Sequence, residues 1–141
     1  LKAKAEYGAN QVLFCPNGDV QETGASNFIL INGDEIITKP LTDEFLHGVT
    51  RDSVLTVAKD LGYTVTERNF TVDELKAAVE NGAEAILTGT AAVISPVTSF
   101  VIDGKEIEVK SQERGYAIRK AITDIQYGLT EDKHGWLVEV C

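Results

Sequence analysis

Short apolar runs separated by turn residues make up the first quarter of the chain. Residues 27–31 are mostly apolar, the turn residues Asn32 and Gly33 follow, and a second apolar run covers residues 35–38. Apolar runs bounded in this way are typical of buried strands joined as a hairpin. Residues 11–23, with Pro-Asn-Gly-Asp at their centre, have the turn chemistry that predicts another hairpin.

Helical periodicity marks several longer segments. Residues 1–8 have the composition of a helix that ends at a glycine, and residues 71–82 open with a capping-box pattern, Thr-Val-Asp-Glu. Residues 111–127 predict a long C-terminal helix. Residues 50–62 predict an amphipathic helix, whose expected apolar stripe is Val54, Leu55, Val57, Ala58 and Leu61.

The remaining apolar or alternating runs are short and predict strands. They cover residues 63–70, 84–88, 93–97, 100–103 and 105–109. Hairpins intermixed with helices, with no repeat and no linker, indicate one compact α+β domain. We expect a mixed, mostly antiparallel, curled sheet flanked by helices.

Composition narrows the class of protein. The chain has 141 residues, of which 43% are hydrophobic and 25% charged, as in ordinary folded domains. The longest uncharged stretch, residues 85–102, is interrupted by glycine and proline and predicts two strands and a turn, so no membrane partner is expected. A net charge of −9 disfavours nucleic-acid binding. With only Cys15 and Cys141, neither a disulfide framework nor a metal site is expected, and a cytoplasmic location with free thiols is predicted.

The first residues suggest that the chain is a piece of a longer protein. It has no methionine, and it begins inside a predicted helix with no signal peptide before it. We therefore expect a domain truncated at its N-terminus.

One candidate ligand loop precedes the helix of residues 50–62. Gly48 allows close approach of a ligand, and the next backbone amides are free donors at the positive end of a helix, an arrangement that binds phosphate. The alternative is that Thr50 is simply the N-cap of this helix.

Two further loops have small residues next to a strand. Residues 88–92, Thr-Gly-Thr-Ala-Ala, would expose amides and hydroxyl groups to an anion, although Gly89 is equally explained by a tight bend. In residues 22–27, Glu22 leads into a small-residue turn and could face a protonated heterocyclic nitrogen. The alternative is an exposed loop carboxylate.

The order and spacing of these elements resemble the class IV pyridoxal 5′-phosphate (PLP) aminotransferases. The resemblance covers nearly the whole chain. The tail, with Tyr127-Gly128 and Gly135-Trp136, is similar to that of the branched-chain members in particular. One departure is that the expected aromatic residue at position 29 is an isoleucine, with Phe28 one place earlier. The elements that carry the resemblance are Glu22-x-x-x-x-Asn27, Ile36-x-Thr38, Leu46-x-Gly48-Val49-x-Arg51, Thr88-Gly89-Thr90-Ala91-Ala92 and Pro96-Val97.

The resemblance implies a role for each loop. The chain would be the larger C-terminal domain of a fold-type IV PLP enzyme, in which strands form a pseudo-barrel. Glu22 would contact the pyridine nitrogen, and the amides of Val49 and Thr50 would hold the phosphate together with the Thr90 side chain. The amides of Thr90 and Ala91 would meet the substrate carboxylate. The implied supporting residues are Gly48, Gly89 and Asn27.

The resemblance also implies the activity. Leucine, isoleucine or valine would pass its amino group to 2-oxoglutarate in a homodimeric enzyme. The Schiff-base lysine and the small N-terminal domain would lie upstream, since Lys2 and Lys4 do not match the catalytic position. We therefore expect residues 1–141 alone to be inactive. A D-amino-acid aminotransferase, an aminodeoxychorismate lyase and a non-catalytic small-molecule-binding domain remain as alternatives.

Overall fold

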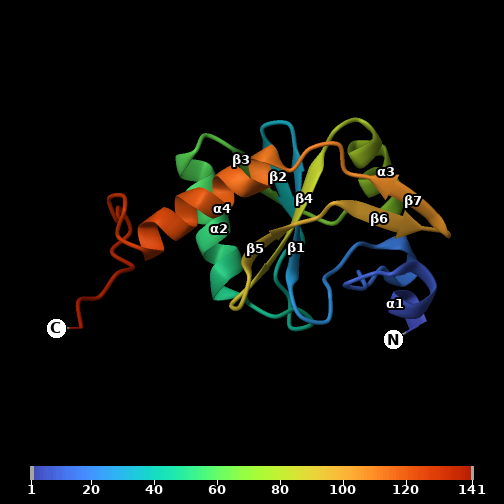
Figure 1. Cartoon of the computed structure of the whole chain (residues 1–141), viewed down its shortest axis with the longest axis horizontal. Helices are drawn as coiled ribbons and strands as arrows, with labels where there is room; N and C mark the ends of the chain where they lie inside the picture. Colours follow the sequence, from blue (N-terminus) through green and yellow to red (C-terminus); the bar gives the residue numbers. More distant parts are fainter. Residues whose placement is uncertain (1, 141) are drawn as a thin grey trace.

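The computed structural model describes residues 2–140, and its mixture of helices and sheet (Figure 1) confirms the predicted α+β class. The helical segments are α1 (Lys2–Tyr7), the 3₁₀ turn η1 (Pro16–Gly18), α2 (Val49–Asp60), α3 (Val72–Glu80) and α4 (Glu113–Gln126). The strands are β1 (Asn27–Asn32), β2 (Glu35–Thr38), β3 (Thr64–Glu67), β4 (Glu84–Gly89), β5 (Val93–Pro96), β6 (Ser99–Ile102) and β7 (Lys105–Glu108).

The main sheet is mixed and open. Its strand order is β3-β2-β1-β4-β5, and every neighbouring pair is antiparallel except β2–β3. A parallel pair needs a crossover connection, and α2 supplies it. Strands β6 and β7 form a separate hairpin, and α3 contacts β7. Among residues 2–140 the strands therefore do not close into the expected barrel, because the last two pack beside α3 instead of extending the main sheet.

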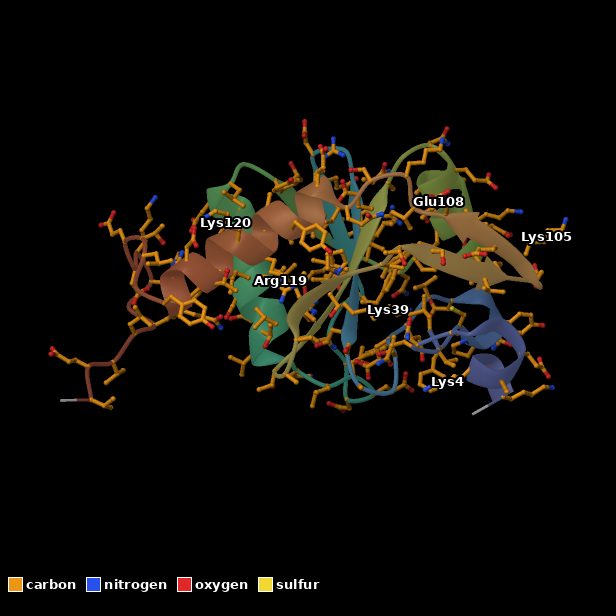
Figure 2. The ribbon with its side chains drawn as sticks, viewed as in Figure 1. Lys4, Lys39, Lys105, Glu108, Arg119 and Lys120 are labelled. Atoms are coloured by element: carbon orange, nitrogen blue, oxygen red, sulfur yellow. The ribbon has the colours of Figure 1, made fainter. Side chains whose placement is uncertain are left out.

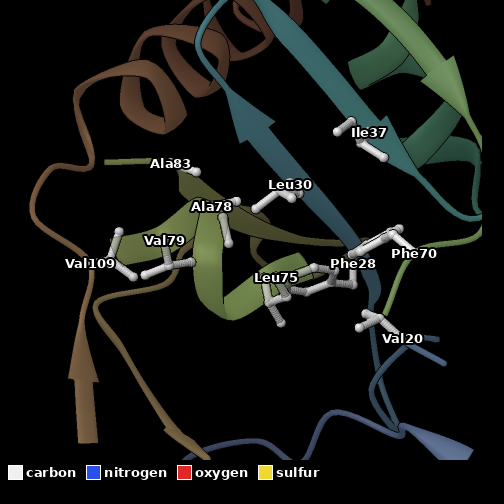
Figure 3. Packing of buried hydrophobic residues seen from close by; sticks show 11 residues of the cluster. Val20, Phe28, Leu30, Ile37, Phe70, Leu75, Ala78, Val79, Ala83 and Val109 are labelled. Carbon is white, nitrogen blue, oxygen red and sulfur yellow. The ribbon is translucent and has the colours of Figure 1, made fainter. Parts of the chain in front are cut away.

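Alternating side chains of β1 build a core on each face of the sheet. Ile29 and Ile31 pack with residues of α2 and α4, whereas Phe28 and Leu30 pack with residues of α3. Figure 1 shows α2 and α4 together on one side of the sheet and α3 on the other. Figure 3 shows the α3-side cluster, in which Leu75 reaches toward Phe28. A strand covered on both faces needs apolar residues at successive positions, which explains the unbroken run in β1.

Two expectations about the elements need correction. Residues 11–23 do not form a hairpin of regular strands, because η1 occupies the turn and only an isolated bridge joins Leu13 to Thr23. Two backbone hydrogen bonds between Phe14 and its neighbours across the turn complete this short pairing. Leu61 does not belong to the apolar stripe of α2, since it is 50% exposed and follows the last helical residue.

The predicted cap of α3 is present in half of its expected form. The Thr71 hydroxyl oxygen accepts a hydrogen bond from the Glu74 amide at 3.2 Å. The Glu74 carboxylate does not return the bond, because the Arg68 guanidinium holds it, and that hydrogen bond lowers the pKa of Glu74 below its ordinary value. A single side-chain cap thus closes this helix.

Replacing Thr71 with alanine is expected to lower the free energy of unfolding by about 1 kcal/mol, because the Glu74 amide loses its acceptor. Urea denaturation of residues 1–141 measures the change. Thr130→Ala, at an exposed position of the C-terminal tail, is the matched control and should change stability little. Equal effects of the two substitutions would contradict a capping role for Thr71.

The C-terminal tail is attached to the far end of α2. The imidazole of His134 lies 2.6 Å from an Asp60 carboxylate oxygen and stacks on the Trp136 ring. The Asp132 carboxylate accepts hydrogen bonds from the amides of Leu137 and His134, and these backbone contacts lower its pKa. The tail therefore lies at the opposite end of α2 from Gly48.

Candidate functional site

The three small-residue loops predicted from the sequence meet at the end of the sheet where β1 begins. A side-chain carbon added to Gly48 would lie 2.3 Å from the Asn27 amide oxygen. A carbon added to Gly89 would lie 3.4 Å from the Ala25 carbonyl oxygen and 3.5 Å from the Ser26 hydroxyl. The loop of residues 22–27 therefore lies between the other two.

Asn27 joins the first two loops through its side chain. Its amide nitrogen donates a hydrogen bond to a Glu22 carboxylate oxygen at 2.9 Å and another to the Leu46 carbonyl at 3.0 Å. Asn27 is the first residue of β1 and is only 6% exposed. Glu22 is half-buried, so the exposed loop carboxylate that was its alternative interpretation is not what the structure shows. One buried amide thus fixes a carboxylate and the approach to α2.

The N-terminus of α2 is open. Gly48 is the N-cap, and no side chain caps the helix; the first intrahelical bond of the helix runs from the Asp52 amide to the Gly48 carbonyl. The amides of Val49, Thr50 and Arg51 have no intrahelical acceptor by the geometry of a helix start. The Val49 side chain is 81% exposed, so the surface here is not covered by the described residues. The alternative that Thr50 is the N-cap is wrong.

The third loop is a tight turn between antiparallel strands. Gly89 ends β4 and pairs with Val93 of β5, and Thr90 and Ala91 are exposed in the connection. The tight bend expected as the alternative for Gly89 is therefore present, and it lies beside the loop of residues 22–27. The turn leaves the polar groups of Thr90 accessible.

A buried hydroxyl group lies next to Asn27. Thr88 of β4 is directly opposite Asn27 in the strand pairing, so the two side chains are on the same face of the sheet. The Thr88 hydroxyl is buried and has no hydrogen-bond partner among the described residues. An unsatisfied buried hydroxyl is costly, and such groups are found where a further polar group is bound.

Arg51 is a residue that the sequence marks only as part of a pattern. It is 3% exposed, and its guanidinium donates to the Lys39 carbonyl at 2.8 Å and to a Glu67 carboxylate oxygen at 2.6 Å. Lys39 lies close to the end of the sheet where β1 begins (Figure 2) and pairs with Asp19. No local sequence signal predicts the contact with Glu67, which lies 16 positions along the chain.

A small internal cavity of about 10 Å³ lies beneath these loops, with room for about one water molecule. Glu22, Asn27, Lys39 and Arg51 are among the residues that line it. A heterocycle of the size of PLP cannot enter this cavity, so a cofactor would lie over the loops. The residues present fit such a group: a carboxylate, an open helix terminus and a glycine whose added side chain would collide with Asn27.

The described chain shows neither of two other kinds of feature. Between residues 2 and 140 no helix is long and apolar enough to cross a membrane. The same residues contain no group of three or more His, Cys, Asp or Glu side chains that could hold a metal ion. Cys15 is a free, half-buried thiol whose pKa is raised by burial, while Cys141 lies outside the described residues.

Comparison with known proteins gives consistent similarities. A family model described as "Amino-transferase class IV" matches residues 1–100. A probable branched-chain-amino-acid aminotransferase of Staphylococcus epidermidis is 38% identical over 96% of this chain and 40% of its own length. A probable branched-chain-amino-acid aminotransferase of Streptomyces coelicolor is 42% identical over 84% of this chain and 34% of its own length. The chain thus spans about two fifths of the length of these curated relatives.

Solved structures share the fold. The branched-chain amino acid aminotransferase of Escherichia coli has a TM-score of 0.80 and 32% identity, covering 96% of this chain and 44% of that protein. A branched-chain amino acid aminotransferase from the source abbreviated T.th., solved with pyridoxamine 5′-phosphate, has a TM-score of 0.79 and 32% identity, covering 95% of this chain and 42% of that protein.

Proposed function

Residues 1–141 belong to the class IV amino-transferase family, and we propose that they supply part of the PLP site of a branched-chain amino-acid transaminase. The observation that carries this proposal is the pair of hydrogen bonds from Asn27, one to Glu22 and one to Leu46. These bonds hold a carboxylate and an open helix N-terminus in one fixed arrangement. A phosphorylated pyridine needs this pair of groups, because it has a basic nitrogen and an anionic phosphate.

Glu22 would control the charge of the cofactor ring. When bound, PLP supplies a protonated ring that withdraws electrons from the α-carbon of the amino acid. A carboxylate next to the ring nitrogen favours its protonated form, because opposite charges at hydrogen-bond distance stabilise each other. Asn27 would orient this carboxylate through the 2.9 Å hydrogen bond, so that one oxygen remains for the ring nitrogen.

The phosphate would lie at the start of α2. The amides of Val49 and Thr50 have no intrahelical acceptor, and the helix dipole favours an anion at this end. Gly48 lets the backbone approach the anion, and the Thr90 hydroxyl would add a hydrogen bond from the neighbouring turn. The Thr90 and Ala91 amides would bind the substrate carboxylate, with Gly89 allowing the two loops to lie close together.

The proposed substrates are leucine, isoleucine and valine as amino donors and 2-oxoglutarate as acceptor. The names of the curated relatives support the branched-chain donors. The T.th. enzyme has been crystallised with N-(5′-phosphopyridoxyl)-L-glutamate and with 4-methylvaleric acid, which supports both glutamate chemistry and a branched apolar side chain.

The lysine that carries the cofactor would come from outside residues 1–141. Lys4 lies on α1 (Figure 2) and does not match the family's catalytic position. Since the chain spans about two fifths of its relatives' length, we propose a longer polypeptide, called the full-length protein below, that adds the lysine segment and the small N-terminal domain. We propose that residues 1–141 are its C-terminal PLP-binding domain, and that the full-length protein is a cytoplasmic homodimer.

The test compares two proteins in one assay. Residues 1–141 and the full-length protein are each incubated with PLP, leucine and 2-oxoglutarate, and glutamate formation is followed. We expect exchange by the full-length protein alone. Exchange by residues 1–141 would contradict the placement of the lysine, whereas no exchange by either would favour the non-catalytic binding domain. Activity of the full-length protein on D-alanine or aminodeoxychorismate, but not leucine, would identify one of the related enzymes instead.

A further inference from the structure

Arg51 connects the two ends of the loop that leads into α2. This loop of residues 39–48 begins immediately after β2 and ends at the N-cap of the helix. Arg51 is in the first turn of α2, yet its guanidinium donates to the carbonyl of Lys39, the first loop residue, at 2.8 Å. The contact therefore fixes the start of the helix relative to the end of β2.

The same guanidinium nitrogen contacts a second element. It lies 2.6 Å from a carboxylate oxygen of Glu67, the last residue of β3. The Arg51 side chain is 4% exposed, whereas the Glu67 side chain is 49% exposed, so Glu67 can reach both the guanidinium and solvent. Because the pair is neutral overall, its effect on an anion at the helix start is expected to be mainly geometric.

The amides of the first turn depend on this fixed position. The amide of Arg51 itself, with those of Val49 and Thr50, points away from the helix without an intrahelical acceptor. A planar guanidinium holds two acceptors in a rigid arrangement, which a flexible lysine ammonium does not reproduce. Displacement of the first turn by a fraction of a hydrogen-bond length would misalign all three donors together.

We propose that Arg51 is the positioning residue of the phosphate cradle, an inference that rests on the proposed function. By holding the Lys39 carbonyl, Arg51 keeps the free amides of α2 aimed at one point. It does not touch the ligand itself. Its contribution is specific to the phosphate group and leaves the contacts to the cofactor ring to Glu22.

The test measures phosphate preference in the full-length protein. Dissociation constants for PLP and for pyridoxal, which lacks the phosphate, are obtained by equilibrium dialysis against the cofactor-free protein. The wild type should prefer PLP, and Arg51→Gln should reduce this preference by about tenfold, the factor that accompanies loss of one hydrogen bond involving a charged group. Pyridoxal affinity should be unchanged. Glu67→Gln is the matched control, because it removes the ion pair but leaves the Lys39 contact, and it should retain the preference.

The outcomes separate the two proposals. A wild type that binds pyridoxal as tightly as PLP would overturn the proposed function and this inference together. A wild type that prefers PLP, with the preference intact in Arg51→Gln or with both affinities reduced equally, would overturn the role of Arg51 alone. If Arg51→Gln does not fold, Arg51→Lys decides: it keeps the buried positive charge, so a reduced preference supports positioning, and an unchanged preference overturns it.

Discussion

Replacing Glu22 with glutamine in the full-length protein is expected to lower kcat for leucine by about 10²- to 10³-fold, corresponding to about 2–4 kcal/mol of lost electrostatic stabilisation. Glutamine has nearly the same shape and can still accept the hydrogen bond that the Asn27 amide donates to Glu22. Only the negative charge is removed, and with it the stabilisation of a protonated ring nitrogen. Steady-state kinetics with leucine and 2-oxoglutarate measure the loss.

A second half-buried carboxylate provides the control for this substitution. Glu35 accepts a hydrogen bond from the Thr66 hydroxyl at 2.6 Å, at the opposite end of the β1–β2 pair. Glu35→Gln removes the same charge from the same domain and should leave kcat nearly unchanged. A Glu22→Gln protein that turns over as fast as Glu35→Gln would support the non-catalytic alternative and remove the basis for assigning Glu22 to the ring.

Replacing Gly48 with alanine is expected to lower both PLP affinity and stability, the latter by about 1–3 kcal/mol, as inserted carbons do in packed sites. The added carbon would lie 2.3 Å from the Asn27 amide oxygen. The backbone of Gly48 has φ −68° and ψ 123°, a conformation that alanine also adopts, so the effect is purely steric. Asn27 cannot turn away without giving up its hydrogen bonds to Glu22 and Leu46. Urea denaturation and PLP titration give the two quantities.

Another glycine of the same region is the matched control. A carbon added to Gly24 would have its nearest neighbour, a Phe14 ring atom, at 3.9 Å, so Gly24→Ala should change neither quantity. In the double variant Gly48→Ala with Asn27→Ala, the collision is removed, and stability should partly return while PLP affinity stays low. Recovery of PLP affinity in the double variant would show that the Asn27 hydrogen bonds are not needed for the site.

The regular elements were predictable from the sequence because local patterns specify them. The apolar run of β1, the turn at Asn32-Gly33 and the cap at Thr71 all depend on residues within a few positions of one another. Errors occurred where tertiary packing decides. Leu61 fits the helical period of α2, but the helix ends before Leu61 can reach the core. The expected barrel failed because packing of β6 and β7 beside α3 is not encoded in the strands' own pattern.

The candidate site was predictable as three separate loops, but its internal connections were not. Glycine and threonine at the head of α2 indicated free amides, and the spacing of Glu22 and Asn27 indicated a paired role. The bonds that join the loops span long distances along the chain: Asn27 to Leu46 covers 19 positions, and Arg51 to Lys39 covers 12. The unpartnered hydroxyl of Thr88 also depends on strand register, which no single segment reveals.

The most direct test of the account is a crystal structure of the full-length protein with bound PLP. We predict that a Glu22 carboxylate oxygen lies about 3 Å from the pyridine nitrogen and that the phosphate accepts hydrogen bonds from the Val49 and Thr50 amides. We also predict that the Thr90 hydroxyl contacts the phosphate and that Asn27 still bridges Glu22 and Leu46. A phosphate bound away from the start of α2, or a ring nitrogen facing a residue other than Glu22, would contradict the account.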